Sequence, residues 1–155
     1  MPNINAIVGL SATAISKGKS ATQEDLDTTK EIFSYIGFVA TLEEKYMDAV
    51  TAFSGSGPAY VLQFYEAFLL AGLKIGLPRD AISQLALYTI TGTAKLLEEL
   101  EKHPAWLRDL VITPGGVTID AVHVMEERGF KAILMSAIYE AYKKSKDISE
   151  LLNNE

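Results

Sequence analysis

The chain of 155 residues contains no cysteine and only two histidines, His103 and His123. Without cysteine it can form neither a disulfide nor a thiolate metal site, and it has no thiol nucleophile. The two histidines do not stand at the spacing of a zinc-binding helix, so we expect no metal site. The lack of disulfides fits a reducing compartment, and we expect a cytoplasmic protein.

Positive charge is also scarce, because 14 Lys and Arg face 20 Asp and Glu and leave a net charge of -6. Nucleic-acid binders hold phosphates through clustered basic residues, so we expect no nucleic-acid partner. The longest apolar stretch, Pro58 to Leu73, contains Gln63 and Glu66 and ends at Lys74. It falls short of a membrane span, and Met1 to Asn5 lacks the basic start of a secretory signal.

The first 43 residues show a strand, helix and strand pattern. Apolar and polar residues alternate from Leu10 to Ala14, a possible capping box stands at Ser20 to Gln23, and Phe38 to Leu42 reads as a second strand. Two strands and one helix do not make a stable sheet by themselves. We therefore expect residues 1–43 to be the end of a larger α/β domain whose beginning is missing.

From Glu43 onward the sequence shows only helical patterns, so the predicted fold class is mainly α. One expected helix, from Pro58, is apolar almost all round, which is costly unless neighbours cover it. In the helix from Arg79 to Lys102, the apolar spacing predicts that one face is buried. That face comprises Ile82, Leu85, Ala86, Thr89, Leu96, Leu97 and Leu100. The remaining expected helices are Tyr46 to Phe53, Pro104 to Val111, Thr118 to Arg128 and a long one from Phe130.

The most informative segment runs from Val111 to Asp120 and contains Thr113-Pro114-Gly115-Gly116. Paired glycines before a helix let a ligand approach the backbone, and the first-turn amides of that helix lack intrahelical partners. A carboxylate or phosphate suits such a place. Local pattern alone still favours an ordinary turn with Thr118 as the helix cap, because turns of this composition are common.

A second glycine-rich segment, Ser54 to Tyr60, follows a helix rather than a strand and lacks the phosphate-loop pattern. It predicts a bend that allows close helix packing, with a supporting role beside a nicotinamide as the alternative. Four isolated polar residues are candidates for acid-base work, but surface or capping roles are more common for such residues. They are Glu66, Glu101, His103 and His123.

These motifs together resemble those of the pyrroline-5-carboxylate reductases. The strongest match runs from His103-Pro104 through Val111 to Thr118 and on to Ala121 to Glu126. Shorter matches fall elsewhere along the chain, at Met1 to Asn3, Ser54 to Tyr60, Gly76 to Arg79, Thr89 with Gly92, and Gly129-Phe130.

The resemblance implies a dehydrogenase with a Rossmann domain for NADPH or NADH, followed by an all-helical dimerisation domain of the 6-phosphogluconate-dehydrogenase-C-terminal-like type. Residues 1–43 would then be the end of the Rossmann domain, and residues 44–155 the dimerisation and substrate-binding domain. No strand in the sequence is followed by the glycine fingerprint G-x-G-x-x-G. We therefore expect the chain to be inactive when it stands alone.

The resemblance also implies a reaction and a site. The family reduces 1-pyrroline-5-carboxylate to proline and works as a homodimer or a higher homo-oligomer. The substrate carboxylate would bind the turn formed by Thr113, Gly115, Gly116 and Val117, and Thr118 would bind it and also lie close to the imine nitrogen as the catalytic residue. Asn3 would lie near the nicotinamide end of the cofactor.

Two other interpretations stay open from the sequence. The chain could be a non-catalytic helical dimer module, since the glycine fingerprint is missing. It could also be the C-terminal domain of another NAD(P)-dependent dehydrogenase, such as those acting on hydroxy acids, which use a lysine in mid-helix as the acid. Lys74 and Lys95 are available for that role, but neither has the expected glycine-rich neighbours.

Overall fold

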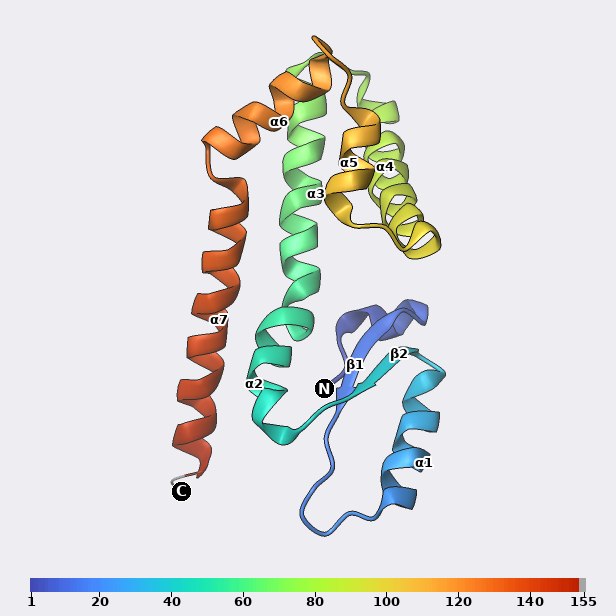
Figure 1. Ribbon diagram of the computed structural model, residues 1–155, viewed down its shortest axis with the longest axis vertical. Helices are drawn as coiled ribbons and strands as arrows, with labels where there is room; N and C mark the ends of the chain where they lie inside the picture. Colours follow the sequence, from blue (N-terminus) through green and yellow to red (C-terminus); the bar gives the residue numbers. More distant parts are fainter. Residues whose placement is uncertain (154–155) are drawn as a thin grey trace. The chain divides into compact units, whose positions relative to one another are not determined.

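The computed structural model describes residues 1–153, and over this range the chain is mostly helical with one small parallel sheet (Figure 1). The predicted fold class is therefore confirmed. Two compact units are present: the first combines Met1–Val61 with the chain from Leu134 onward, and the second is Leu62–Ile133. Each unit is described by itself below.

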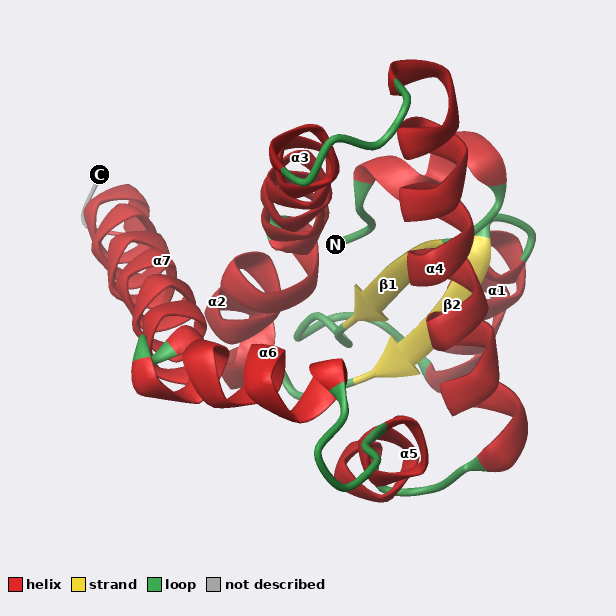
Figure 2. Ribbon diagram, turned by 90° about the horizontal axis from the view of Figure 1, so that it is seen from above, coloured by secondary structure: helices red, strands yellow, loops and turns green. Residues whose placement is uncertain are grey.

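The sheet of the first unit consists of β1, Ser11–Ile15, and β2, Gly37–Thr41, joined by helix α1, Gln23–Ser34. Figure 2 shows the two strands side by side and pointing the same way. A five-residue 3-10 turn, η1, Ile4–Val8, precedes β1. The strand, helix and strand pattern is confirmed, and β2 begins one residue earlier than predicted, at Gly37.

The capping box of α1 differs from the predicted one at Ser20 to Gln23. The N-cap is Thr22, whose hydroxyl accepts from the Asp25 amide at 3.1 Å, while the Asp25 carboxylate accepts from the Thr22 amide at 2.7 Å. An ionised carboxylate is a stronger acceptor than the Gln23 amide of the predicted box. The helix therefore takes its cap two residues later than expected.

The helical run that follows is interrupted at the predicted bend. It consists of the 3-10 turn η2, Glu44–Tyr46, helix α2, Met47–Val50, the π turn η3, Thr51–Gly55, and helix α3, Gly57–Lys74. The π turn widens the helix, and the Ser56 amide reaches back five residues to the Thr51 carbonyl at 2.9 Å. Side chains bond two other carbonyls of the turn: the Tyr60 hydroxyl donates to Ala52 O, and Asn3 Nδ2 donates to Ser54 O.

The remaining helices agree with the sequence patterns to within a few residues. They are α4, Arg79–Leu100, α5, Pro104–Val111, α6, Val117–Glu127, and α7, Phe130–Asn153. Helix α4 stops two residues before the predicted end because Glu101 adopts a left-handed conformation with φ 47°. None of the helices among the described residues is long and apolar enough to cross a membrane.

Fewer residues of α4 are buried than predicted. Ile82 and Ala86 are buried, and Ile82 packs so closely on Gly72 of α3 that a Cβ there would lie 3.0 Å from its side chain. The other apolar residues expected inside are exposed, namely Leu85, Leu96, Leu97 and Leu100, as is Thr89. Helical spacing identifies an apolar face, but it does not say whether the same chain covers it.

In the first unit, the Asp48 carboxylate joins α2 to the C-terminal part of α7. Its Oδ1 accepts hydrogen bonds from the hydroxyls of Ser145 at 2.8 Å and Ser149 at 2.7 Å. Hydrogen bonds from Ser149, and next from Ser145, lower the pKa of Asp48. These bonds connect residues about a hundred positions apart in the sequence, so they help to hold the first unit together.

We expect Asp48→Asn to lower the free energy of unfolding at pH 7 by about 1 kcal/mol, because two hydroxyls lose a charged acceptor in a half-exposed place. Since the folded state lowers the pKa of Asp48, this stabilisation is full above the unfolded pKa of about 3.9 and is lost as the pH falls through the folded value. Urea unfolding of both proteins at several pH values measures it. The double variant Ser145→Ala, Ser149→Ala should lose a similar amount of unfolding free energy. If the difference between Asp48→Asn and the parent is the same in acid as at pH 7, this account is wrong.

Candidate functional site

The turn between α5 and α6 brings five predicted site residues together in the second unit. Helix α5 ends at Val111, Ile112 is extended, and Gly115 turns the chain with φ 69° before α6 begins at Val117. Thr113, Gly115, Gly116, Val117 and Thr118 therefore occupy one short turn and the start of one helix. We call Thr113 to Thr118 the glycine turn.

Glycine is favoured at both positions, for different reasons. Gly115 has a left-handed φ that side chains other than glycine rarely adopt, although a Cβ there would meet nothing within 4 Å. Gly116 has an ordinary φ of -81°, but a Cβ there would lie 2.3 Å from the Thr113 hydroxyl oxygen. The Gly116 amide also donates to the Thr113 carbonyl at 3.0 Å, so the turn closes tightly upon itself.

The start of α6 offers unpaired N–H groups to a ligand. Gly116 occupies the N-cap position and has no side chain to bond the first-turn amides. Val117 is 87% exposed and Thr118 is half-buried, so an anion can reach the amides and the Thr118 hydroxyl. The acidic residue of this first turn, Asp120, is exposed, where water and salt screen its charge. The geometry suits a carboxylate or a phosphate.

Asn3 belongs to the first unit, whereas the glycine turn belongs to the second. Its Nδ2 donates to the Ser54 carbonyl at 3.0 Å and its Oδ1 accepts from the Asn5 amide at 3.2 Å. Its own amide donates to the Ser11 hydroxyl at 3.1 Å. The carboxamide is thus held in place, and it retains one N–H and one lone pair for a ligand.

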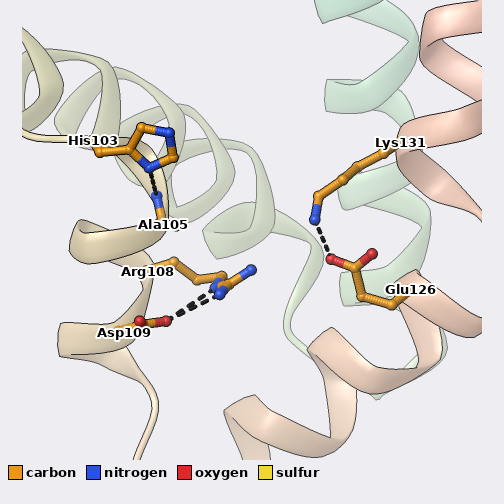
Figure 3. A network of polar contacts seen from close by, with 6 residues as sticks. All are labelled: His103, Ala105, Arg108, Asp109, Glu126 and Lys131. Carbon is orange, nitrogen blue, oxygen red and sulfur yellow. Dashed lines mark hydrogen bonds and ion pairs between the residues drawn. The ribbon is translucent and has the colours of Figure 1, made fainter.

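The four isolated polar candidates do not converge on a visible acid-base pair. Glu66 and His123 are exposed on helices, and Glu101 is the left-handed residue that ends α4. His103 caps α5, with its Nδ1 accepting from the Ala105 amide at 3.2 Å (Figure 3). Of the roles that the sequence left open for His103, the structure shows capping. The following Pro104, a residue favoured at the first helical position, is the signal that indicates a cap.

Two exposed ion pairs of the second unit complete the polar contacts in Figure 3. Arg108 pairs with its neighbour Asp109 at 3.1 Å, and Lys131 pairs with Glu126. The hydrogen bond from Lys131 lowers the pKa of Glu126. Such exposed pairs contribute little to stability. Among the described residues, no group of three or more His, Asp or Glu side chains could hold a metal ion.

Comparison with known proteins identifies the family. A family model described as pyrroline-5-carboxylate reductase dimerisation matches residues 44–148, which is most of the chain. The chain belongs to the pyrroline-5-carboxylate reductase family. The match includes α5, the glycine turn and α6.

Relatives and solved structures in the pyrroline-5-carboxylate reductase family agree along nearly the whole chain. The chain is 45% identical over 150 residues to a pyrroline-5-carboxylate reductase of Synechocystis sp., covering 97% of this chain and 56% of that protein. A structure from Streptococcus pyogenes has a TM-score of 0.90 at 31% identity, covering 95% of this chain and 57% of that one. A Plasmodium falciparum structure with NADP bound has a TM-score of 0.88 at 34% identity, covering 95% and 59%.

The chain therefore spans about half the length of the curated pyrroline-5-carboxylate reductases that it matches. Family membership excludes the interpretation of the chain as a domain of another kind of dehydrogenase. The boundary predicted between residues 43 and 44, and the roles predicted for individual site residues, stay predictions.

We expect Gly116→Ala to destabilise the glycine turn because the added methyl collides with the Thr113 hydroxyl. The collision should lower the free energy of unfolding by about 1 to 3 kcal/mol. Adding Thr113→Ala to Gly116→Ala should recover part of that loss, giving a favourable coupling energy in a urea-unfolding double-mutant cycle. Gly115→Ala serves as the control: it should cost about 1 to 2 kcal/mol through backbone strain and show no such recovery with Thr113→Ala. If Thr113→Ala recovers the same amount of stability in both glycine variants, the collision between residue 116 and the Thr113 hydroxyl is not the cause.

Proposed function

We propose that the protein carrying this chain reduces 1-pyrroline-5-carboxylate to L-proline with NADPH or NADH, and that the glycine turn holds the substrate carboxylate. The observation that carries the proposal is the uncapped start of α6, where Gly116 leaves first-turn N–H groups without a side-chain partner. Family membership supports the reaction. The chemistry of the turn, which suits an anion, supports the assignment of the carboxylate.

In the proposed binding mode, the Val117 amide at the start of α6 faces the carboxylate, and the Thr118 hydroxyl donates to it or to the ring nitrogen. Charge-assisted hydrogen bonds of this kind are stronger than neutral ones, and the dipole of α6 adds to them. The Gly116 amide keeps its bond to the Thr113 carbonyl and so holds the shape of the turn. Thr113 supports the turn from the other side through its contact with Gly116. The acid group of the substrate would then fix how the five-membered ring is oriented.

The reaction adds a hydride to the carbon of the C=N bond and a proton to its nitrogen. NADPH or NADH supplies the hydride when bound, as is usual for nicotinamide enzymes. This chain would contribute Asn3 beside the nicotinamide end, through the N–H and lone pair that its contacts with Ser54 and Asn5 leave free. No covalent nucleophile is needed, so the lack of cysteine is no obstacle. The catalytic role of these residues is placement within reach of the reacting atoms.

We further propose that the protein acts as a homodimer. Helix α3 exposes apolar side chains along its length, with Leu62 at 64% and Leu70 at 60%. In the first unit, a cavity of about 660 Å³ lies between α2 and α7, and Phe53, Met135 and Tyr139 are exposed around it. Apolar surfaces of this extent are stable in water only when a partner covers them. The family match, described as dimerisation, contains both surfaces.

The role of Thr118 is testable in the chain joined to a complete cofactor domain. We expect oxidation of NADPH only in the presence of pyrroline-5-carboxylate, and Thr118→Ala should raise KM for the imine roughly 10-fold or more, because one hydrogen bond to a charged group is lost. Thr118→Ser, which keeps the hydroxyl, is the matched control and should stay close to the parent. If Thr118→Ala matches the parent, the assigned site is wrong; if the parent shows no imine-dependent oxidation, the non-catalytic dimer module is the better account.

Dimer formation is testable by size-exclusion chromatography with light scattering. We expect the parent to elute at about twice its chain mass of 16.9 kDa and Leu62→Glu to shift it to the monomer, because a charge would be buried in the apolar interface. Ile7→Glu is the matched control, since Ile7 is 83% exposed but lies outside the dimerisation match. A parent that elutes as a monomer at micromolar concentration would remove the dimer from the proposal.

A further inference from the structure

Helix α5 is short, and few contacts hold it. It has eight residues, Pro104–Val111, and its buried side chain is Leu107, with 6% of its surface exposed. The pair between Arg108 and Asp109 joins neighbours on the surface and does not fasten the helix to anything else. Isolated helices of this length are marginal in water. The contacts at the ends of α5 therefore contribute a larger share of its stability than they would in a long helix.

His103 provides the contact at the start of α5. Its Nδ1 accepts from the Ala105 amide, and its carbonyl accepts from the amides of Trp106 at 2.9 Å and Leu107 at 3.3 Å. Pro104 has no N–H, so Ala105 supplies the first amide of the helix that needs a partner. Figure 3 shows the imidazole turned back over this amide. His103 thus acts as an N-cap through the ring nitrogen bonded to Cγ.

The other end of α5 leads directly into the glycine turn. Val111 is the last helical residue, Ile112 is extended, and Thr113 follows at once. The Thr113 carbonyl accepts a hydrogen bond from the Gly116 amide. The Thr113 hydroxyl oxygen would lie only 2.3 Å from a Cβ on Gly116. Only Ile112 separates α5 from the glycine turn. If α5 shifts or frays, Thr113 therefore moves, and the amides at the start of α6 move with it.

We propose that His103 is a positioning residue for the glycine turn. By capping α5 through Nδ1 it fixes the place of Thr113, and through Thr113 the shape of the turn that receives the carboxylate. The imidazole need not touch the substrate. This inference rests on the proposed function for the meaning of the turn, but the capping itself is a property of the chain alone.

Three substitutions separate a cap from a direct contact. His103→Asn places an acceptor oxygen on Cγ, at the same bond separation as Nδ1. His103→Gln places the same amide one bond further out, near the position of Nε2. His103→Ala removes both. A capping role is restored by Asn and not by Gln, whereas a role in which Nε2 touches the ligand is restored by Gln and not by Asn.

The first measurement is hydrogen exchange of the Ala105 and Gly116 amides in the chain as it is, without substrate. We expect exchange at both amides to speed up roughly fivefold in His103→Ala and His103→Gln, as the loss of a typical N-cap predicts, and to stay like the parent in His103→Asn. The second measurement is steady-state kinetics in the chain joined to a complete cofactor domain. There KM for the imine should rise roughly fivefold in the Ala and Gln variants with kcat nearly unchanged, because the turn holds the ground state and the transition state alike.

Either of two results overturns the proposal. One is that His103→Gln restores the parent's exchange rates and KM while His103→Asn does not. The other is that the exchange rate of the Gly116 amide is the same in the parent and in every His103 variant. If His103→Ala does not fold, the comparison of Asn with Gln still decides. The two proposals fail separately. A parent without imine-dependent activity removes the proposed function, while the exchange of Ala105 and Gly116 still tests whether His103 positions the turn.

Discussion

The chain leaves much of its apolar surface uncovered. Among the described residues, the buried hydrophobic side chains are few: Ala14, Ile15, Ala52, Ile82, Ala86 and Leu107. Long helices such as α3 and α7 carry large apolar side chains that stay exposed. Burial of apolar area is the main favourable term in folding, so these helices need further contacts. The proposed homodimer would provide such contacts.

The proposed site depends on the absence of side chains at the two glycines of the turn. Gly116 at the N-cap supplies no oxygen to the first amides of α6, where serine, threonine, aspartate or asparagine would be favoured. Leaving this cap out costs stability, yet it keeps N–H groups free for an anionic ligand. Thr113 lies in the space that a Cβ on Gly116 would fill, so the same glycine also lets the turn close.

Single side-chain hydrogen bonds lie beside several of the proposed functional groups. Asn3 and Tyr60 bond two carbonyls of the π turn, and His103 caps the helix that leads to the glycine turn. Each is one hydrogen bond, worth on the order of 1 kcal/mol. Their effect is large relative to their energy, because each fixes one end of a short element next to a proposed binding group.

Sequence patterns predicted the kind of every major element and most of their limits, because hydrophobic period, proline and glycine act locally. The helix Pro104 to Val111 was predicted to the residue, since Pro104 starts it and the turn that follows ends it. The position of the glycine turn was also predicted from the sequence. Local pattern alone favoured an ordinary turn there, and only the resemblance of its motifs to one family made it a predicted carboxylate site. Local signals were sufficient for these features because each depends on neighbours within about one helical turn.

The cap of α1 is a local feature that the predicted box at Ser20 missed, since Thr22 and Asp25 stand only three residues apart. Two other features needed the tertiary structure, because each depends on residues far apart in the chain or on surroundings that a pattern does not encode. The face of α4 predicted to be buried is exposed outside Ile82 and Ala86. The bonds from Ser145 and Ser149 to Asp48 join helices that no sequence spacing relates. Residue patterns were enough to predict which faces are apolar and where the backbone turns. Which of those faces are covered, and which distant polar groups meet, depends on how the elements pack in three dimensions.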